Sequence, residues 1–199
     1  AVANGAVDPS VAGDAEPAFI VVANRLPVEL TENDDGTVEW TRSPGGLVTA
    51  LEPVLAARES IWVGWSGVAA EEAHDVPPAP ETNGASRLVQ IPLSRQQVRS
   101  YYEGFCNSTL WPLYHDATVT PKYHRRTYEA YRQVNERFAG TVAEIAPRGA
   151  TVLVQDYQLQ LVPSMLRRNR PDLTIGFFLH IPFPPIELFS QLPWRRAIM

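Results

Sequence analysis

The sequence is poor in cysteine and in positive charge, and it lacks long apolar runs. Its one cysteine, Cys106, excludes an internal disulfide and a cysteine-based zinc cluster. A formal net charge of −5 at pH 7 argues against general nucleic-acid binding, which depends on a basic surface. No apolar stretch approaches the roughly 20 residues of a membrane-spanning helix. These absences favour a protein of the reducing cytoplasm that binds neither nucleic acid nor membranes.

The composition nevertheless supports a folded domain. Of the 199 residues, 45% are hydrophobic and 20% are charged, which suits one domain with a sizeable core. Residues 1–17 differ from the rest, because small residues dominate them together with Asp, Glu and Pro. They have neither a basic start nor a long apolar run, so we expect a flexible tail and no secretory signal. The fold is expected to begin at residue 18.

Short apolar segments alternate with segments of helical periodicity. Strands are predicted at 19–23, 60–67, 87–93, 151–157 and 173–185, with the third at a sheet edge and the last two buried. One helix is predicted to run for about three turns from Gly45. A second is predicted at 94–105, with a Ser cap at its start and its end near 104–107. Further helices are predicted at 123–145 and at 161–171. An NDDG turn within 31–43 predicts a hairpin. The alternation predicts an α/β fold, a Rossmann-like parallel sheet flanked by helices.

Two of these helices have a clear apolar face. The face of the first holds Leu47, Ala50, Leu51, Val54 and Leu55, and the face of the helix at 123–145 holds Tyr131, Val134, Phe138, Val142 and Ile145. Spacings of three and four residues place such side chains on one side of a helix, where they are expected to pack on the sheet.

Polar residues follow three of the predicted strands. Asn24 and Arg25 end the first, Asp156 ends the fourth, and His180 follows the apolar part of the last. Because the carboxyl ends of parallel strands meet at one edge, where ligands bind, these side chains are expected to lie together. The helix start at Gly45–Gly46 can face the same edge and offer backbone N–H groups to an anion. The sequence thus predicts a ligand site at this edge without naming the ligand.

Each of these residues also has an ordinary structural explanation. Arg25 is equally a surface ion-pair partner or a bidentate clamp on a phosphate or carboxylate. Asp156 either caps the next helix or accepts hydrogen bonds from ligand hydroxyls. A lone His180 is more often an interior histidine, although the stiff IPFPP turn after it favours a fixed polar group. The Gly-Gly pair is a weak signal, and neither G-x-G-x-x-G nor G-x-x-x-x-G-K-[ST] occurs, which argues against dinucleotide-fingerprint and P-loop sites.

Aromatic residues are most often core residues, although their faces also suit a sugar beside hydroxyl-binding groups. Trp62 and Trp65 are expected on opposite sides of their strand unless Gly64 forms a bulge. Tyr102 and Trp111 are nine residues apart, which places them on opposite faces of a continuous helix. They can therefore share a site only if that helix breaks between them.

Seven segments occur in a familiar order. They are VVANRLPV, SPGGLVTAL, WVGWSG, YYEGFCNSTLWPLYH, YEAYRQVNERFA, VLVQDYQLQLVPSMLR and IGFFLHIPFP. Together they resemble the N-terminal half of the trehalose-6-phosphate synthases, a family of retaining glycosyltransferases with the GT-B fold. The resemblance spans residues 18–199, and the alanine, arginine and proline usage favours an actinobacterial type.

The resemblance implies transfer of glucose from UDP-glucose or ADP-glucose to glucose 6-phosphate with retention, giving trehalose 6-phosphate. It implies acceptor-binding roles for Arg25, Trp65, Tyr102, Trp111 and Asp156, donor-binding roles for Gly45, Gly46 and His180, and catalytic roles for Asp156 and His180. It implies no cofactor and no metal, and a homo-oligomer. Since Asp156 is the one carboxylate at the predicted edge, a front-face mechanism is favoured over a double displacement that needs two carboxyl groups.

The chain departs from the family in two ways. Where the family often has HDYHL, this sequence has QDYQL, so Gln155 and Gln158 cannot titrate and are assigned no acid–base role. A GT-B enzyme also has two domains around its active site, whereas residues 18–199 correspond to the N-terminal, acceptor-binding domain alone. The nucleotide-sugar-binding C-terminal domain is absent from the chain, which by itself is expected to be inactive.

Three other functions remain open. A sister GT-B transferase could use another phosphorylated acceptor, such as glycerol 3-phosphate or a pseudo-sugar phosphate. A non-catalytic domain could bind a sugar phosphate and regulate partners. A dehydrogenase is the weakest of the three, because the dinucleotide fingerprint is missing.

Overall fold

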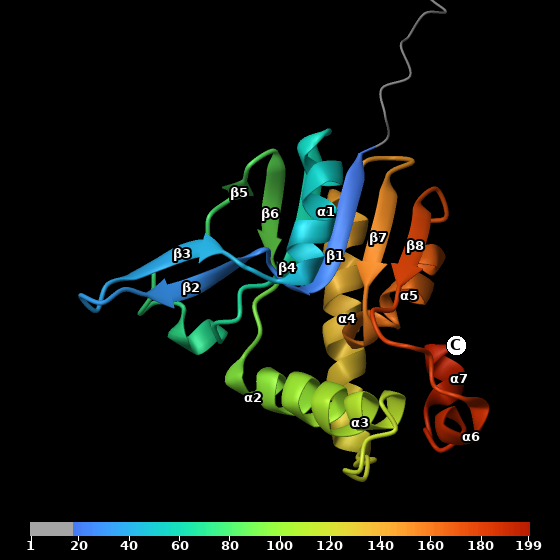
Figure 1. Ribbon diagram of the computed structural model, residues 1–199. Coiled ribbons are helices and arrows are strands. Elements are labelled where there is room, and N and C mark those ends of the chain that lie inside the picture. Colours follow the sequence, from blue (N-terminus) through green and yellow to red (C-terminus); the bar gives the residue numbers. More distant parts are fainter. Residues whose placement is uncertain (1–17) are drawn as a thin grey trace, which may run out of the picture.

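The computed structural model describes residues 18–199; the tail predicted at residues 1–17 lies outside the described residues. A six-stranded sheet has the order β5-β6-β4-β1-β7-β8 (Figure 1). Its strands are β1 (Phe19–Arg25), β4 (Ser60–Trp65), β5 (Thr82–Asn83), β6 (Ser86–Gln90), β7 (Thr151–Gln155) and β8 (Thr174–Phe178). All pairs are parallel except that of the two-residue β5 with β6. The predicted α/β fold with a parallel sheet is confirmed.

A separate hairpin follows β1. Strands β2 (Val28–Glu32) and β3 (Val38–Arg42) are antiparallel. Their turn contains Gly36, whose φ is 80°, and the carboxylate of Asp35 accepts hydrogen bonds from the side chain and the backbone of Thr37. These hydrogen bonds lower the pKa of Asp35. The predicted hairpin around NDDG is confirmed.

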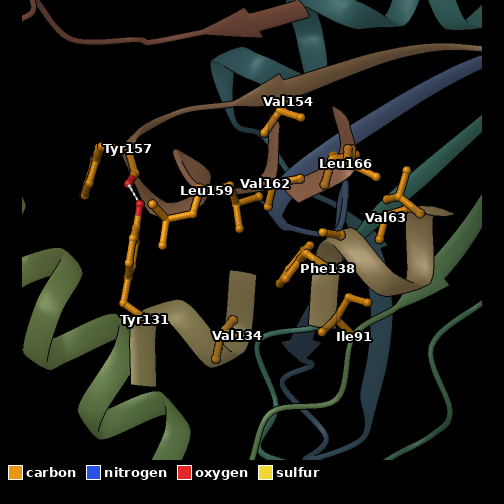
Figure 2. Packing of buried hydrophobic residues seen from close by; sticks show 14 of the residues in the cluster. Val63, Ile91, Tyr131, Val134, Phe138, Val154, Tyr157, Leu159, Val162 and Leu166 are labelled. Atoms are coloured by element: carbon orange, nitrogen blue, oxygen red, sulfur yellow. Dashed lines mark hydrogen bonds between the residues drawn. The ribbon is translucent and has the colours of Figure 1, made fainter. Parts of the chain in front are cut away.

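Helices cover both faces of the sheet. Helix α1 (Gly46–Ala56) packs on the face that holds Phe19 and Val21, whereas α4 (Arg125–Ile145) and α5 (Val162–Asn169) pack on the face that holds Ile20 and Val22. The division follows from strand geometry, because successive side chains of β1 point to opposite faces. Figure 2 shows the larger core, in which Phe138 of α4 lies among Val63, Val154 and Leu166.

The apolar face predicted for α4 is confirmed, whereas only part of the face predicted for α1 is buried. In α4 the side chains of Tyr131, Val134, Phe138 and Val142 are buried and Ile145 is half-buried. In α1 the buried residues are Val48 and Leu55, whereas Ala50 and Val54 are exposed. Only one side of α1 has the sheet against it, so a narrow stripe through 48, 51 and 55 is covered and the rest of the predicted face is not.

The helix predicted at 94–105 is much longer than expected. Its elements α2 (Arg95–Gln97), η2 (Val98–Leu110) and α3 (Trp111–Tyr114) follow one another without a gap. Ser94 caps it as predicted, in a capping box with Gln97. The predicted end near 104–107 is wrong, because Gly104 serves packing: a Cβ there would lie 2.8 Å from Cγ2 of Thr127 in α4.

The central part of this run, η2, is a π-helix. The backbone N–H of Trp111 donates to the carbonyl of Cys106, five residues back. Its fully buried side chains recur after four or five residues, at 101, 105, 106, 109 and 110. A spacing wider than 3.6 residues therefore keeps one side of the run against α4.

Strand β8 is not buried as predicted. It lies at the edge of the sheet, where Phe177 is 40% and Phe178 55% exposed. The remaining elements are the short helices η1 (Ala70–Glu72), η3 (Tyr157–Leu159), α6 (Ile186–Phe189) and α7 (Arg195–Ile198). In residues 18–199 no helix combines the length and the apolar character needed to cross a membrane.

We expect Phe138→Ala to lower the free energy of unfolding by about 3–5 kcal/mol, because it leaves a cavity in the larger core. Gln133→Ala, at an exposed position of the same helix, should change it by less than about 0.5 kcal/mol. Urea unfolding followed by circular dichroism measures both. Equal losses in the two variants would contradict the packing described for α4.

Candidate functional site

A cavity of about 350 Å³ lies at the carboxyl-terminal edge of the sheet. Its lining includes Arg25 at the end of β1, Gly45 before α1, Tyr102 of η2, Asp156 after β7 and His180 after β8. The predicted convergence of strand-end residues is therefore observed. A wider groove of about 700 Å³ between the start of α2 and the start of α4 receives none of these residues.

Arg25 presents a positive charge that has no counter-ion among the described residues. Its guanidinium carbon lies 4.9 Å from the centroid of the Trp65 ring, a cation–π arrangement. Within residues 18–199 no carboxylate forms a salt bridge with Arg25. Since a planar guanidinium can donate two hydrogen bonds to two oxygens of the same anion, Arg25 suits a phosphate or a carboxylate in the cavity.

Asp156 has a backbone conformation that is rare for a residue with a side chain. Its φ is 68° and its ψ is 171°, a combination that costs roughly 1–3 kcal/mol. Its Oδ1 accepts hydrogen bonds from the backbone N–H of Tyr157, at 2.9 Å, and of His180, at 3.3 Å. The capping role offered by the sequence is confirmed, because Oδ1 caps η3. The carboxylate also lines the cavity, and its role toward ligand hydroxyls stays a prediction.

His180 is fixed by the residue before Asp156. The distance from His180 Nε2 to Oε1 of the buried Gln155 is 2.8 Å. With the amide oxygen as acceptor, Nε2 donates this hydrogen bond, and Nδ1 forms no hydrogen bond with the described residues. The side-chain amide of Gln155 thus orients the imidazole of His180.

The start of α1 suits an anion. Gly45, Leu47 and Val48 line the cavity, and α1 has no acidic residue in its first turn. Side chains added at Gly45 or Gly46 would meet no protein atom closer than 3.6 Å, so the fold itself does not require glycine there. Backbone N–H groups at a helix start attract negative charge, and the glycines leave them open to a ligand.

The comparison with known families decides the identity of the chain. The sequence model of glycosyltransferase family 20 matches residues 17–199. The chain belongs to glycosyltransferase family 20. It is 59% identical over 189 residues to trehalose-6-phosphate synthase of Mycobacterium ulcerans and 60% identical over 183 residues to that of Mycolicibacterium vanbaalenii. These matches cover 95% and 91% of the chain but 37% of each relative, so the chain spans little more than a third of their length.

Solved structures show the same fold. A UDP-forming α,α-trehalose-phosphate synthase from Burkholderia vietnamiensis is similar with a TM-score of 0.76 and 31% identity, over 92% of this chain and 37% of that one. An E. coli protein bound with UDP-2-fluoro glucose has a TM-score of 0.74, 30% identity and coverage of 91% and 37%. A Burkholderia xenovorans synthase in complex with glucose-6-phosphate has a TM-score of 0.72, 28% identity and coverage of 91% and 37%. The sheet flanked by helices is thus part of the GT-B architecture of this family.

Three of the residues predicted for the site, Trp65, Trp111 and Gly46, do not line the cavity in this family 20 chain. Trp65 is buried beneath Arg25, and its indole N–H donates to the carbonyl of Val68. Trp111 is 44% exposed, is stacked on His115 with ring centroids 4.3 Å apart, and does not line the cavity. Gly46 is likewise not among the lining residues, although Gly45 and Leu47 are. Their roles in binding remain predictions.

The expectation that Tyr102 and Trp111 lie on opposite faces of a continuous helix is corrected by η2. In a helix whose hydrogen bonds join residues five apart, a turn takes more than 3.6 residues, so a separation of nine residues is close to two turns and places positions 102 and 111 on about the same side. The edge of Tyr102 meets the ring of Trp65, with centroids 5.9 Å apart. An unbroken helix is therefore compatible with a shared site.

Sequence reasoning missed a buried hydrogen-bond network behind Asp156. The hydroxyl of Tyr131 donates to the carbonyl of Tyr157 at 2.9 Å (Figure 2) and accepts from the N–H of Gln160 at 3.1 Å. The amide of Asn135 donates to the carbonyl of Gln158 and accepts from the N–H of Leu161, both at 3.1 Å. The network thus pairs four backbone groups of the segment 157–161.

A signal for this network was present in the sequence. Asn135 falls on the apolar face of α4, four residues after Tyr131, and both residues are fully buried. A polar side chain on such a face needs a buried partner. Burial also raises the pKa of Tyr131 well above its usual value, and likewise that of Tyr101, whose hydroxyl donates to Asn24 at 2.7 Å. Both phenols therefore remain protonated donors.

Within residues 18–199 no three metal-ligating side chains are grouped to hold an ion.

We expect Tyr131→Phe to lower the free energy of unfolding by about 1–3 kcal/mol, because it leaves a buried carbonyl and a buried N–H without their partner. Tyr128→Phe is the matched control on the same helix, since no residue of the described chain is hydrogen-bonded to the Tyr128 hydroxyl. Urea unfolding gives the free energies, and amide exchange at 157–161 gives the local effect. Equal protection of these amides in the two variants would contradict the role of the network.

Proposed function

We propose that residues 18–199 are the acceptor-binding domain of a longer retaining glycosyltransferase. The enzyme transfers glucose from a nucleotide-glucose donor, UDP-glucose or ADP-glucose, to glucose 6-phosphate and yields trehalose 6-phosphate. The observation that carries the proposal is the cavity in which the unpaired Arg25 cation and the Asp156 carboxylate face one ligand space. A phosphate at one end and sugar hydroxyls at the other are the chemistry that these two groups recognise.

The relatives support the same assignment. The names of the mycobacterial relatives are those of trehalose-6-phosphate synthases, and one similar structure is in complex with glucose-6-phosphate. Since the chain spans 37% of these relatives, the remainder of the enzyme supplies the second wall of the site. We propose that this remainder binds most of the nucleotide sugar, so the chain alone is inactive. A homo-oligomer stays a prediction.

The mechanism that we propose needs no covalent intermediate. Asp156 is the one carboxylate among the described residues that line the cavity, whereas double displacement uses two. The bond from the glucose anomeric carbon to the donor phosphate breaks, and the acceptor hydroxyl bonds to the same face of that carbon. The departing nucleoside diphosphate takes the hydroxyl proton.

In this mechanism the groups of residues 18–199 orient the two substrates and stabilise the charge that develops on the donor phosphate. Arg25 holds the acceptor phosphate, Asp156 holds acceptor hydroxyls, and His180 contacts the transferred glucose. The first turn of α1 faces the negative charge that develops on the donor phosphate. Tyr102, Trp65 and Trp111 complete the acceptor side.

We expect Arg25→Ala in the full-length enzyme to raise the KM for glucose 6-phosphate about ten- to a hundredfold, because a charge-assisted contact contributes roughly 1.5–3 kcal/mol. The KM for the nucleotide sugar should stay within about twofold. Arg87→Ala, at an exposed position of β6, is the matched control and should leave both values unchanged. An unchanged KM for glucose 6-phosphate in Arg25→Ala would refute the phosphate role.

We expect Asp156→Asn to lower kcat/KM for glucose 6-phosphate by at least about a hundredfold. The fold should be retained, because the asparagine oxygen can still accept from the N–H of Tyr157. Mass spectrometry of the wild-type enzyme during turnover should detect no glucosyl adduct. Detection of glucose attached to Asp156 would replace the front-face mechanism with a double displacement.

A further inference from the structure

The segment from Trp62 to Gly67 contacts both the backbone and the side chain of Arg25. One set of these contacts is with the backbone. The indole N–H of Trp62 donates to the Arg25 carbonyl at 2.9 Å, and the N–H of Leu26 donates to the carbonyl of Trp65 at 2.8 Å. At Gly64 a Cβ would lie 2.6 Å from the carbonyl carbon of Arg25. The end of β1 and the segment 62–67 are thus in direct backbone contact.

The second set of contacts is with the Arg25 side chain. The guanidinium lies over the ring of Trp65, and a Cβ at Gly67 would lie 2.1 Å from Arg25 Nη2 and 2.5 Å from Cζ. Gly67 has a φ of 92°. The other glycines of positive φ in residues 18–199, Gly36, Gly84 and Gly149, have no atom within 4 Å of such a Cβ. Gly67 thus leaves its side-chain space to Arg25.

The turn that carries Gly67 is itself held in place. Ser66 Oγ accepts hydrogen bonds from the N–H of Val68, at 3.3 Å, and from the side-chain amide of Gln90, at 3.0 Å. The indole N–H of Trp65 donates to the carbonyl of Val68 at 2.9 Å. A collision at position 67 would therefore be relieved by the flexible end of Arg25 and not by the turn.

We propose that Gly67 is a positioning residue that sets the place of the Arg25 guanidinium on Trp65 and thereby the affinity for the acceptor phosphate. An alanine at 67 would move Nη2 by about 1.3 Å, from 2.1 Å to the 3.4 Å of ordinary contact. Misplacements of about 1 Å in a binding site cost on the order of a hundredfold in rate. The consequence for the phosphate rests on the proposed function, whereas the placement of the guanidinium does not.

The first test uses Gly67→Ala and Gly36→Ala in the full-length enzyme. Both add a side chain at a positive φ, so both are expected to lower the urea midpoint by similar amounts. Gly67→Ala should raise the KM for glucose 6-phosphate at least tenfold and leave the KM for the nucleotide sugar unchanged, and Gly36→Ala should change neither. Adding Gly67→Ala to Arg25→Ala should cause no further loss. A further tenfold loss in that double variant would overturn the proposal, because Gly67 would then act without Arg25.

The second test is independent of any substrate. In the wild type, the Nε–Hε resonance of Arg25 should be shifted upfield by the Trp65 ring current, and this shift should be lost in Gly67→Ala but kept in Gly36→Ala. An unchanged resonance in Gly67→Ala overturns the proposal. If the shift is lost while the KM for glucose 6-phosphate stays the same, the positioning role stands and the phosphate role of Arg25 fails. The variant Gly64→Ala is unsuited to this test, because its clash is with backbone atoms.

Discussion

The site depends on hydrogen bonds from α4 to the segment that follows β7. Tyr131 and Asn135 pair the buried backbone groups of 157–161, and unpaired groups of that kind would each cost about 1–3 kcal/mol. These bonds let the chain turn sharply at Asp156, whose positive φ is unfavourable by itself. The position of the carboxylate in the cavity is thus maintained by residues that do not line it.

A second constraint is the charge of Arg25. Its guanidinium has no counter-ion in the part of the chain that the structure describes, and it is tolerated at the sheet edge because it is exposed to solvent and contacts the Trp65 ring. The peptide group between Arg25 and Leu26 is hydrogen-bonded through both its carbonyl and its N–H to the segment 62–67, so flexibility is confined to the Arg25 side chain. His180 is restrained in a comparable way by Gln155. Preorganisation of this kind reduces the entropy lost when a ligand binds.

Two predictions from the sequence were wrong for the same reason. Gly104 was interpreted as a helix end, yet it is the point of close contact with Thr127. Strand β8 was interpreted as buried from its apolar run, yet Phe178 is more than half exposed at the sheet edge. In both cases the pattern of the segment is real, but its meaning depends on a neighbour that is distant in sequence. The π-helix η2 also has no local signal, because its wider turn follows from packing against α4.

The sequence by itself determined the alternation of strands and helices, the strand ends that deliver Arg25, Asp156 and His180 to one edge, and membership of the family. The first two features follow from local periodicity and from the common direction of parallel strands, and the third follows from the seven ordered segments that resemble the family. Only the tertiary structure decided how the side chains are held: Trp65 beneath Arg25, Gln155 against His180, and Tyr131 with Asn135 behind Asp156. These contacts join residues as much as 40 positions apart along the chain, and their geometry arises from the packing of helices on the sheet, which no local pattern encodes.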